Sequence, residues 1–138
     1  MKVTLKKVDN DFHLQGFGTS GVPVNLDGAE SIGGHNQGAR PMELMLMALG
    51  SCSAMDMISI LRKQKLEIED FNVEINASRR ENETPSIFEK IHMTFLFKGN
   101  LDEEKIKRAV ELSVEKYCSV YNIIKETAEI TYSYKIIN

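Results

Sequence analysis

The chain has 138 residues, of which 42% are hydrophobic and 27% are charged. This composition is typical of a globular protein with a sizeable core, so we expect a single domain over residues 1–138. The formal net charge is −3 and no basic run occurs, which argues against nucleic acid as a partner. No signal peptide is visible, and the most apolar window, residues 44–61, contains polar residues that disfavour a membrane span. We therefore expect a cytoplasmic protein.

The first 26 residues predict a small antiparallel meander, because apolar and polar residues alternate in three short runs. Residues 16–21 match the pattern GxGxxG. A dinucleotide site needs that pattern to open a helix after a strand, whereas Pro23 and alternating apolar residues follow here. We interpret these glycines as hairpin residues. Residues 27–39 form a glycine-rich loop without a phosphate-binding pattern.

A long helix is predicted from Pro41 to Lys65. Pro41 suits the first helical position, and Glu43 suits the positive end of the helix dipole. Residues 44–49 are apolar on every side, which indicates a buried helix. The apolar surface of this helix exceeds what a small sheet covers. We therefore expect an obligate homodimer in which a second copy completes the burial.

The second half of the chain alternates between strands and helices. Period-two patterns predict strands at residues 71–77, 87–97 and 128–136. Asn100, with Glu103 three residues later, resembles a helix-opening box, and this helix runs to about Lys116. We place Tyr117 on its apolar face and expect a short helix next, at residues 120–125. This order predicts an α+β fold.

Cys52 and Cys118 are the two cysteines, and in the cytoplasm such residues are more often thiols or redox centres than structural disulfides. Cys52 lies inside the long helix, where a free cysteine can simply be a small buried hydrophobe. Its small neighbours Gly50 and Ser51 would let a substrate or another backbone approach the sulfur. Cys118 precedes the short helix, whose N-terminus favours a thiolate. The alternative for Cys118 is a loop cysteine without a role.

We expect no metal site and no cofactor. The three histidines, His13, His35 and His92, form no metal-ligand pattern with the cysteines. His92 belongs to a sheet surface, whereas His35 lies in the glycine loop before the long helix and is a candidate for lining a pocket. The GxSxG elbow of a serine hydrolase does not occur.

Two segments carry a family resemblance. Residues 40–56 (RPMELMLMALGSCSAMD) and residues 116–120 (KYCSV) resemble the two cysteine segments of the OsmC/Ohr superfamily, and the first is closest to its YhfA-like branch. The order of strands and helices fits the family over nearly the whole chain. The resemblance implies antiparallel sheets wrapped around a long central helix in an intertwined homodimer, with two active sites at the interface.

The resemblance further implies a peroxidase in which Cys52 is peroxidatic and Cys118 is resolving. The substrate would be an organic hydroperoxide, and the reductant a dithiol such as a lipoyl group or a small thiol. Arg40 is a candidate for stabilising the Cys52 thiolate, and Glu43 is a candidate for a further catalytic residue. Three positions depart from the family pattern. Glu43 lies nine rather than ten positions before Cys52, no arginine precedes Arg40, and Ser119 stands where proline is commoner.

Two other functions stay open. One is a non-catalytic dimeric module that binds a small hydrophobic ligand at the dimer interface. The other is an acyl thioesterase of the hot-dog fold, which also wraps a sheet around a long helix. The carboxylate or histidine that such a thioesterase needs near its helix is not clearly placed in this sequence.

Overall fold

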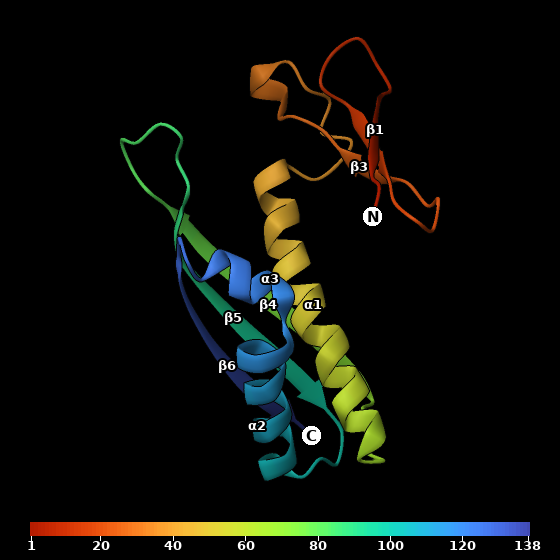
Figure 1. The fold of residues 1–138 in the computed structure, drawn as a ribbon, viewed down its shortest axis with the longest axis vertical. Helices are drawn as coiled ribbons and strands as arrows, with labels where there is room; N and C mark the ends of the chain where they lie inside the picture. The colour runs from red at the N-terminus through yellow and green to blue at the C-terminus, as the bar shows by residue number, and fades with distance from the viewer. The chain divides into compact units, whose positions relative to one another are not determined.

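The computed structural model describes residues 1–138, which divide into two compact units (Figure 1). The N-terminal unit spans Met1–Leu46 and the C-terminal unit spans Met47–Asn138. The chain holds two three-stranded sheets. One long helix, α1 (Pro41–Lys63), begins in the first unit and continues into the second. The predicted α+β class is confirmed, whereas the single domain and the second copy stay predictions.

The N-terminal unit contains the predicted antiparallel meander. Its strands are β1 (Thr4–Lys7), β2 (Leu14–Phe17) and β3 (Val24–Leu26), in that order across the sheet. Gly21, in the β2–β3 connection, has a φ of 73°, a left-handed conformation that glycine adopts without steric cost. The GxGxxG stretch is therefore a hairpin and opens no helix, as interpreted from the sequence.

A buried carboxylate organises the loop between β3 and α1, which also contains a short 3-10 turn, η1 (Glu30–Ile32). Asp27 accepts backbone N–H bonds from Gly28 at 2.7 Å, His35 at 3.2 Å and Gln37 at 3.0 Å. Burial works to raise the pKa of Asp27, but these three bonds outweigh it and hold the pKa below its ordinary value. The loop thus has a fixed course although it is rich in glycine.

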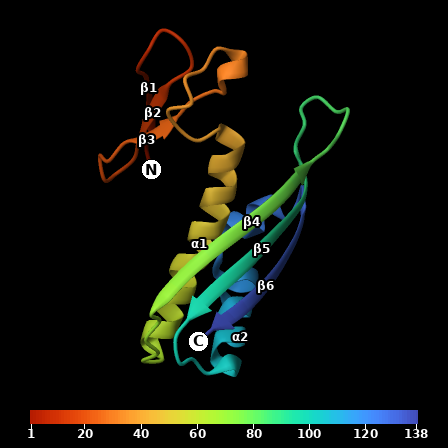
Figure 2. The ribbon, with the colours of Figure 1, turned by 180° about the vertical axis from the view of Figure 1, so that it is seen from behind.

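Helix α1 ends close to where the sequence predicts, because Lys65 adopts a left-handed φ of 58° shortly after it. In the C-terminal unit it buries residues at helical spacing: Leu49, Gly50, Ser53, Met57 and Leu61. Figure 2 shows this part of α1 and helix α2 (Glu103–Glu111) on the same face of the second sheet. One face of α1 therefore contributes to the core.

The prediction that α1 is buried on every side is met only in part. Met45, Met47 and Met55 are 43%, 52% and 70% exposed. By length and composition α1 also qualifies as a membrane span, although the polar residues of its apolar window were expected to disfavour one. Core helices of soluble proteins pass the same test, so one such helix does not by itself indicate a membrane protein. Only 28% of its apolar window is buried, which leaves an apolar surface without cover.

The second sheet comprises β4 (Asp70–Arg79), β5 (Phe88–Lys98) and β6 (Glu129–Ile137). Alternate residues of β5 form the buried face, as predicted: Ile91, Met93, Phe95 and Phe97. The β4–β5 pair is the predicted antiparallel hairpin, but β5 and β6 are parallel. The helical crossover between β5 and β6 returns β6 in the direction of β5, which a tight hairpin could not do.

Three helical segments form the crossover: α2, the π-helix η2 (Leu112–Tyr117) and α3 (Ser119–Ile124). The cap of α2 is Asp102, which accepts a bond from the backbone N–H of Lys105 at 3.0 Å, so the prediction of Asn100 as the cap is wrong. The π-helix rotates the end of this segment away from the predicted face. Tyr117 is consequently 51% exposed instead of buried.

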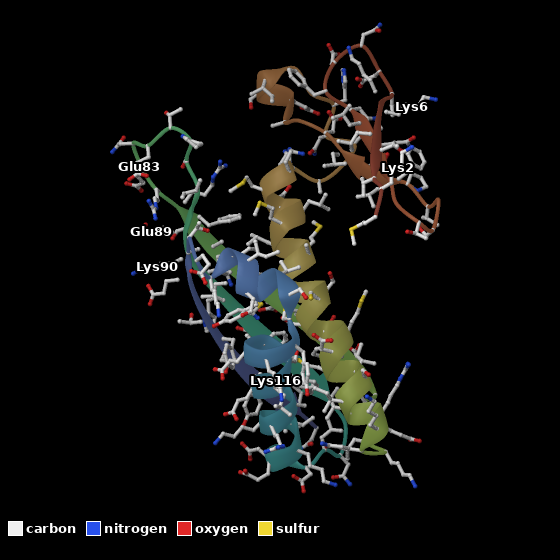
Figure 3. All side chains as sticks on the ribbon, in the orientation of Figure 1. Lys2, Lys6, Glu83, Glu89, Lys90 and Lys116 are labelled. Atoms are coloured by element: carbon white, nitrogen blue, oxygen red, sulfur yellow. The ribbon has the colours of Figure 1, made fainter.

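Charged side chains lie on the outside of each unit (Figure 3). Lys2 and Lys6 in the N-terminal unit and Glu83, Lys90 and Lys116 in the C-terminal unit are all exposed. Such charges leave the interior to apolar groups and to a few buried polar ones, which therefore need individual explanations.

Candidate functional site

Cys118 is the N-cap of α3. Its backbone N–H donates to the Ser113 carbonyl at 2.8 Å, a bond that spans five residues and closes the π-helix. Its sulfur accepts the Tyr121 N–H at 3.3 Å. The residue is 0% exposed. The sequence placed Cys118 correctly at a helix start, but α3 has only six residues, so local N–H groups matter more here than a helix dipole.

Cys52 lies on α1 and is partly exposed. The Cys118 thiol reaches the same helix, since it points at the Leu49 carbonyl with a sulfur–oxygen distance of 4.0 Å. Cys52 lies three residues after Leu49 on that helix, near enough to Cys118 to contribute to its pKa, and both thiols are free. The fold therefore brings together, between α1 and the start of α3, two cysteines that are 66 positions apart in the sequence.

The two thiols have different surroundings. Burial raises the pKa of Cys118 above its ordinary value, and the interaction with Cys52 raises it further. The Ser53 hydroxyl and the Tyr121 N–H act in the opposite direction without cancelling the rise. Cys118 is thus a protonated, buried thiol at neutral pH. Cys52 has more access to solvent and to a reactant that arrives from outside.

Gly50 and Ser51, predicted to line a pocket, have structural roles. A Cβ atom on Gly50 would lie 2.7 Å from Cδ1 of Ile75, so the glycine lets α1 approach β4 closely. The Ser51 side chain is exposed, and its hydroxyl donates to the Ala48 carbonyl of the same helix at 3.3 Å. The small residues beside Cys52 therefore serve packing first, and their part in a pocket stays a prediction.

The charged candidates have local partners at the start of α1. The Arg40 N–H donates to Glu43 Oε1 at 2.9 Å, which is the reciprocal half of a capping box. The Arg40 guanidinium donates to the Gly38 carbonyl at 3.1 Å. Glu43 therefore stabilises the first turn of α1, and any role of Arg40 or Glu43 in thiol chemistry stays a prediction.

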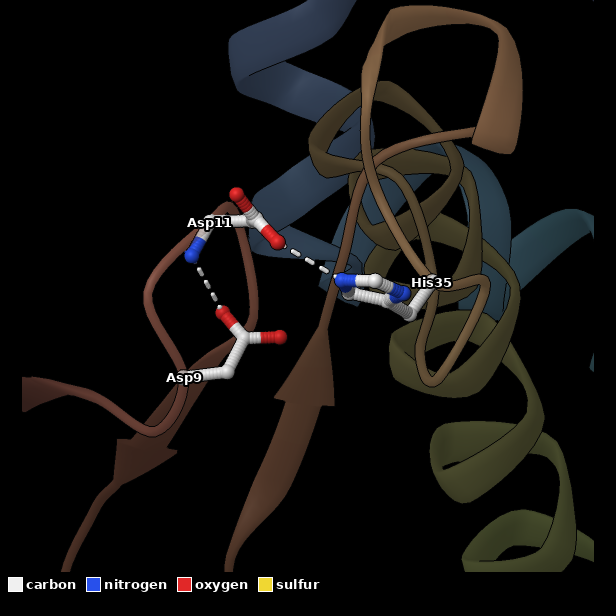
Figure 4. A group of neighbouring side chains, drawn as sticks. All are labelled: Asp9, Asp11 and His35. Carbon is white, nitrogen blue, oxygen red and sulfur yellow. Dashed lines mark hydrogen bonds and ion pairs between the residues drawn. The ribbon is translucent and has the colours of Figure 1, made fainter.

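His35 bonds the turn that follows β1. Its Nε2 lies 2.7 Å from Asp11 Oδ2, and this bond raises the pKa of His35 (Figure 4). Asp9 in turn accepts the Asp11 N–H at 2.8 Å. The ligand atoms of Asp9, Asp11 and His35 lie within 4.8 Å of one another, close enough for a metal ion. They are already engaged with one another and with the backbone, so we assign them to holding the loop.

Sequence reasoning missed the polar residues that join the cysteine segments. Ser113 Oγ donates to the Ser53 carbonyl at 2.6 Å inside the core. Both serines are 0% exposed. The position of Ser53 directly after Cys52 was a usable signal. Nothing in the pattern around Ser113 indicated a contact across 60 positions of sequence.

Comparison with known proteins identifies the family of the chain. The OsmC-like protein family matches residues 34–133, a range that includes both cysteines. Protein YhfA of Escherichia coli is 38% identical over 123 residues, which cover 88% of this chain and 88% of that protein. The chain belongs to the OsmC-like family.

Two solved structures extend the comparison. A hypothetical protein from Aquifex aeolicus has 30% identity and a TM-score of 0.80, over 99% of this chain and 97% of that one. The organic hydroperoxide resistance protein OhrB of Bacillus subtilis has 22% identity and a TM-score of 0.64, over 97% and 96% of the two chains. At that identity the second likeness shows the fold alone.

Proposed function

We propose that this chain is a thiol-dependent peroxidase that reduces organic hydroperoxides through Cys52 and Cys118. The observation that carries the proposal is geometric: the buried Cys118 thiol reaches the Leu49 carbonyl of α1, the helix on which the partly exposed Cys52 thiol lies three residues later. Membership of the OsmC-like family favours a redox or peroxidase role, and the fold is shared with an organic hydroperoxide resistance protein.

The reaction begins at Cys52. Its thiolate attacks the terminal oxygen of R–O–O–H, the O–O bond breaks, and the alkoxide takes a proton to leave as an alcohol. Cys52 becomes a sulfenic acid, having given two electrons to the peroxide. Cys118 then attacks this sulfur, expelling hydroxide that becomes water, and a disulfide forms. A dithiol, such as a lipoyl group or a small thiol, reduces the disulfide and is itself oxidised.

The surroundings of the thiols suit this division of labour. A peroxidatic cysteine must meet an external substrate, and Cys52 is the more accessible sulfur. A resolving cysteine must stay unoxidised until its partner reacts. Burial and a raised pKa keep Cys118 in the less reactive thiol form. Arg40 completes the proposal as the positive charge that stabilises the Cys52 thiolate, and Glu43 as a further catalytic residue. His35, Gly50 and Ser51 are the proposed pocket residues.

We further propose that the protein acts as a cytoplasmic homodimer. The uncovered apolar surface of α1 supports this assembly, because exposed apolar patches of that kind mark interfaces. Two free thiols agree with a reducing compartment. Light scattering during gel filtration measures the assembly, and a strictly monomeric protein at micromolar concentration would contradict it.

Mass spectrometry after one equivalent of cumene hydroperoxide tests the cycle. The wild type should lose two hydrogens per chain as the disulfide forms. Cys118→Ser should stop at a sulfenic acid that dimedone traps, and Cys52→Ser should consume no peroxide. Ser59→Ala, at an exposed position of α1, is the matched control and should behave as the wild type. Full peroxidase activity in Cys52→Ser would falsify the proposal.

One observation favours the alternative of a binding module. Cys118 is 0% exposed, so its burial alone accounts for a small hydrophobic residue in the core. In that case both cysteines would be incidental, and a small hydrophobic ligand would occupy the dimer interface. Peroxide treatment would then leave the mass of the wild-type chain unchanged.

A further inference from the structure

Ser53 carries a buried hydroxyl without a hydrogen-bond partner. The residue is 0% exposed, and its Oγ contacts neither solvent nor a conventional acceptor. A buried hydroxyl left in this state is costly, and such groups are rare in native proteins. Alanine would fill the same place on α1 without the cost. The hydroxyl therefore needs an explanation beyond packing.

Two independent sets of contacts place Cys118 close to Ser53, one through the Cys118 sulfur and the other through its backbone N–H. In an α-helix the carbonyl of residue i−4 accepts the N–H of residue i, so the Leu49 carbonyl adjoins Ser53. The Cys118 thiol lies 4.0 Å from that carbonyl. From the other side, the Cys118 N–H donates to Ser113, whose hydroxyl donates to the Ser53 carbonyl. Ser113 thus links the backbone of Cys118 to that of Ser53 through two hydrogen bonds.

The Cys118 sulfur has one firm donor, the Tyr121 N–H at 3.3 Å. A thiol needs little more, but a thiolate in a buried site needs further donors to offset its lost hydration. The Ser53 hydroxyl rotates freely about its Cβ–Oγ bond and competes for no other acceptor. It is the available second donor.

We propose that Ser53 is the hydrogen-bond donor that stabilises the Cys118 thiolate. The inference rests on the proposed function, because that cycle makes Cys118 anionic twice. Cys118 is a thiolate when it attacks the Cys52 sulfenic acid, with hydroxide as the leaving group, and it is a thiolate again when a reductant thiolate releases it from the disulfide. In both steps the serine keeps its own proton.

The electrostatics of the thiol form agree with this assignment. Burial raises the pKa of Cys118, and the Ser53 hydroxyl makes the largest of the contributions that lower it. No bond of conventional length and angle joins the two groups while the sulfur is neutral. We expect the contact to shorten as negative charge develops, since charge-assisted hydrogen bonds are shorter and stronger than neutral ones.

The test compares Ser53→Ala with Ser53→Thr, which keeps the hydroxyl, and with Ser59→Ala, an exposed serine of the same helix. Thiolate absorbance near 240 nm is followed against pH in a Cys52→Ser background. The same titration of a Cys52→Ser, Cys118→Ser double variant, in which only the four tyrosines contribute, is subtracted and leaves the signal of Cys118. At a fixed pH below the midpoint, Ser53→Ala should reduce the thiolate fraction about tenfold. Threonine should restore most of the loss, and Ser59→Ala should change nothing.

Stability separates this role from packing. Removing an unpartnered hydroxyl should leave the thermal unfolding midpoint unchanged or raise it. A lower midpoint with an unchanged thiolate fraction would overturn the inference. The titration needs no peroxide, so it also stands apart from the proposed function. An inactive protein in which Ser53→Ala still suppresses the thiolate would retain the contact and refute only the cycle.

Discussion

The N-terminal and C-terminal units are stabilised in different ways. Every buried apolar side chain of the core belongs to Met47–Asn138, among them Leu49, Phe95 and Val110. In Met1–Leu46 the buried residues are Gly16, Asp27 and Gly34, which bring no apolar side chain inside. One unit therefore rests on packing, and the other on backbone pairing and a buried carboxylate.

The N-terminal unit also leaves much of its apolar surface exposed. The N-terminal unit exposes large apolar side chains along its strands and turns: Val3, Leu5, Val8, Phe12, Val22, Val24 and Ile32. Such a sheet has little apolar burial to offset the entropy of ordering it. A second copy that covers these side chains would supply the burial, which gives the proposed homodimer a physical reason beyond the surface of α1.

The largest expected effect is the loss of a core ring. Phe95→Ala removes a side chain that is 0% exposed and should lower the free energy of unfolding by about 3–5 kcal/mol. Phe12→Ala makes the same chemical change in the N-terminal unit, where the ring is 49% exposed, and should cost about 1 kcal/mol or less in the monomer. Urea denaturation measures both.

The stability costs of these two variants should depend differently on protein concentration. If a second copy covers Phe12, the cost of Phe12→Ala should grow with concentration as dimers form, while the cost of Phe95→Ala stays constant. Equal, large costs at every concentration would contradict the division into a packed unit and an unpacked one.

Periodicity predicted most of the secondary structure because local alternation decides it. The buried face of β5 and the helix around Cys52 follow from periods of two and of 3.6 residues. The cap at Asp102 was missed because Asn100 and Glu103 satisfy the same spacing rule. The exposure of Tyr117 could not be predicted, since a π-helix changes the helical period without a mark in the sequence.

The candidate site, too, has features that local patterns predict and others that depend on tertiary packing. Each cysteine was placed on its helix from local patterns, but their pairing came from the family resemblance, because no local rule brings residues 52 and 118 together. The bond from Ser113 to Ser53 depends on how α1 packs against the crossover. Tertiary packing of this kind is not encoded in any short window of the chain.

An effect of intermediate size is expected at Asp27, the buried carboxylate that organises the loop of the N-terminal unit. Asp27→Ala removes the acceptor of three backbone N–H groups, so amide exchange at Gly28, His35 and Gln37 should accelerate roughly tenfold. Amides of β5 should keep their protection. Equal acceleration in both units would mean that the loop and the core unfold together.

The stabilisation that the Asp27 carboxylate gives to the loop should weaken in acid. The folded-state pKa of Asp27 is lowered, so the stabilisation is complete above the unfolded pKa of about 3.9 and is lost as pH falls through the folded value. Acid should therefore raise loop exchange in the wild type and have little further effect in Asp27→Ala.

The smallest effect is expected at the His35–Asp11 pair, whose side chains are 57% and 47% exposed. The Asp11 bond raises the pKa of His35, so Asp11→Asn should move the NMR titration of His35 toward lower pH. Because the folded pKa is raised, the pair stabilises fully below pH about 6.5 and loses its effect as pH rises through the folded value. Solvent and salt screen exposed pairs, so global unfolding should not change measurably.

Glu30→Gln removes a charge from the same unit without touching His35 and should leave its titration in place. An unmoved His35 titration in Asp11→Asn would contradict the bond between the two side chains.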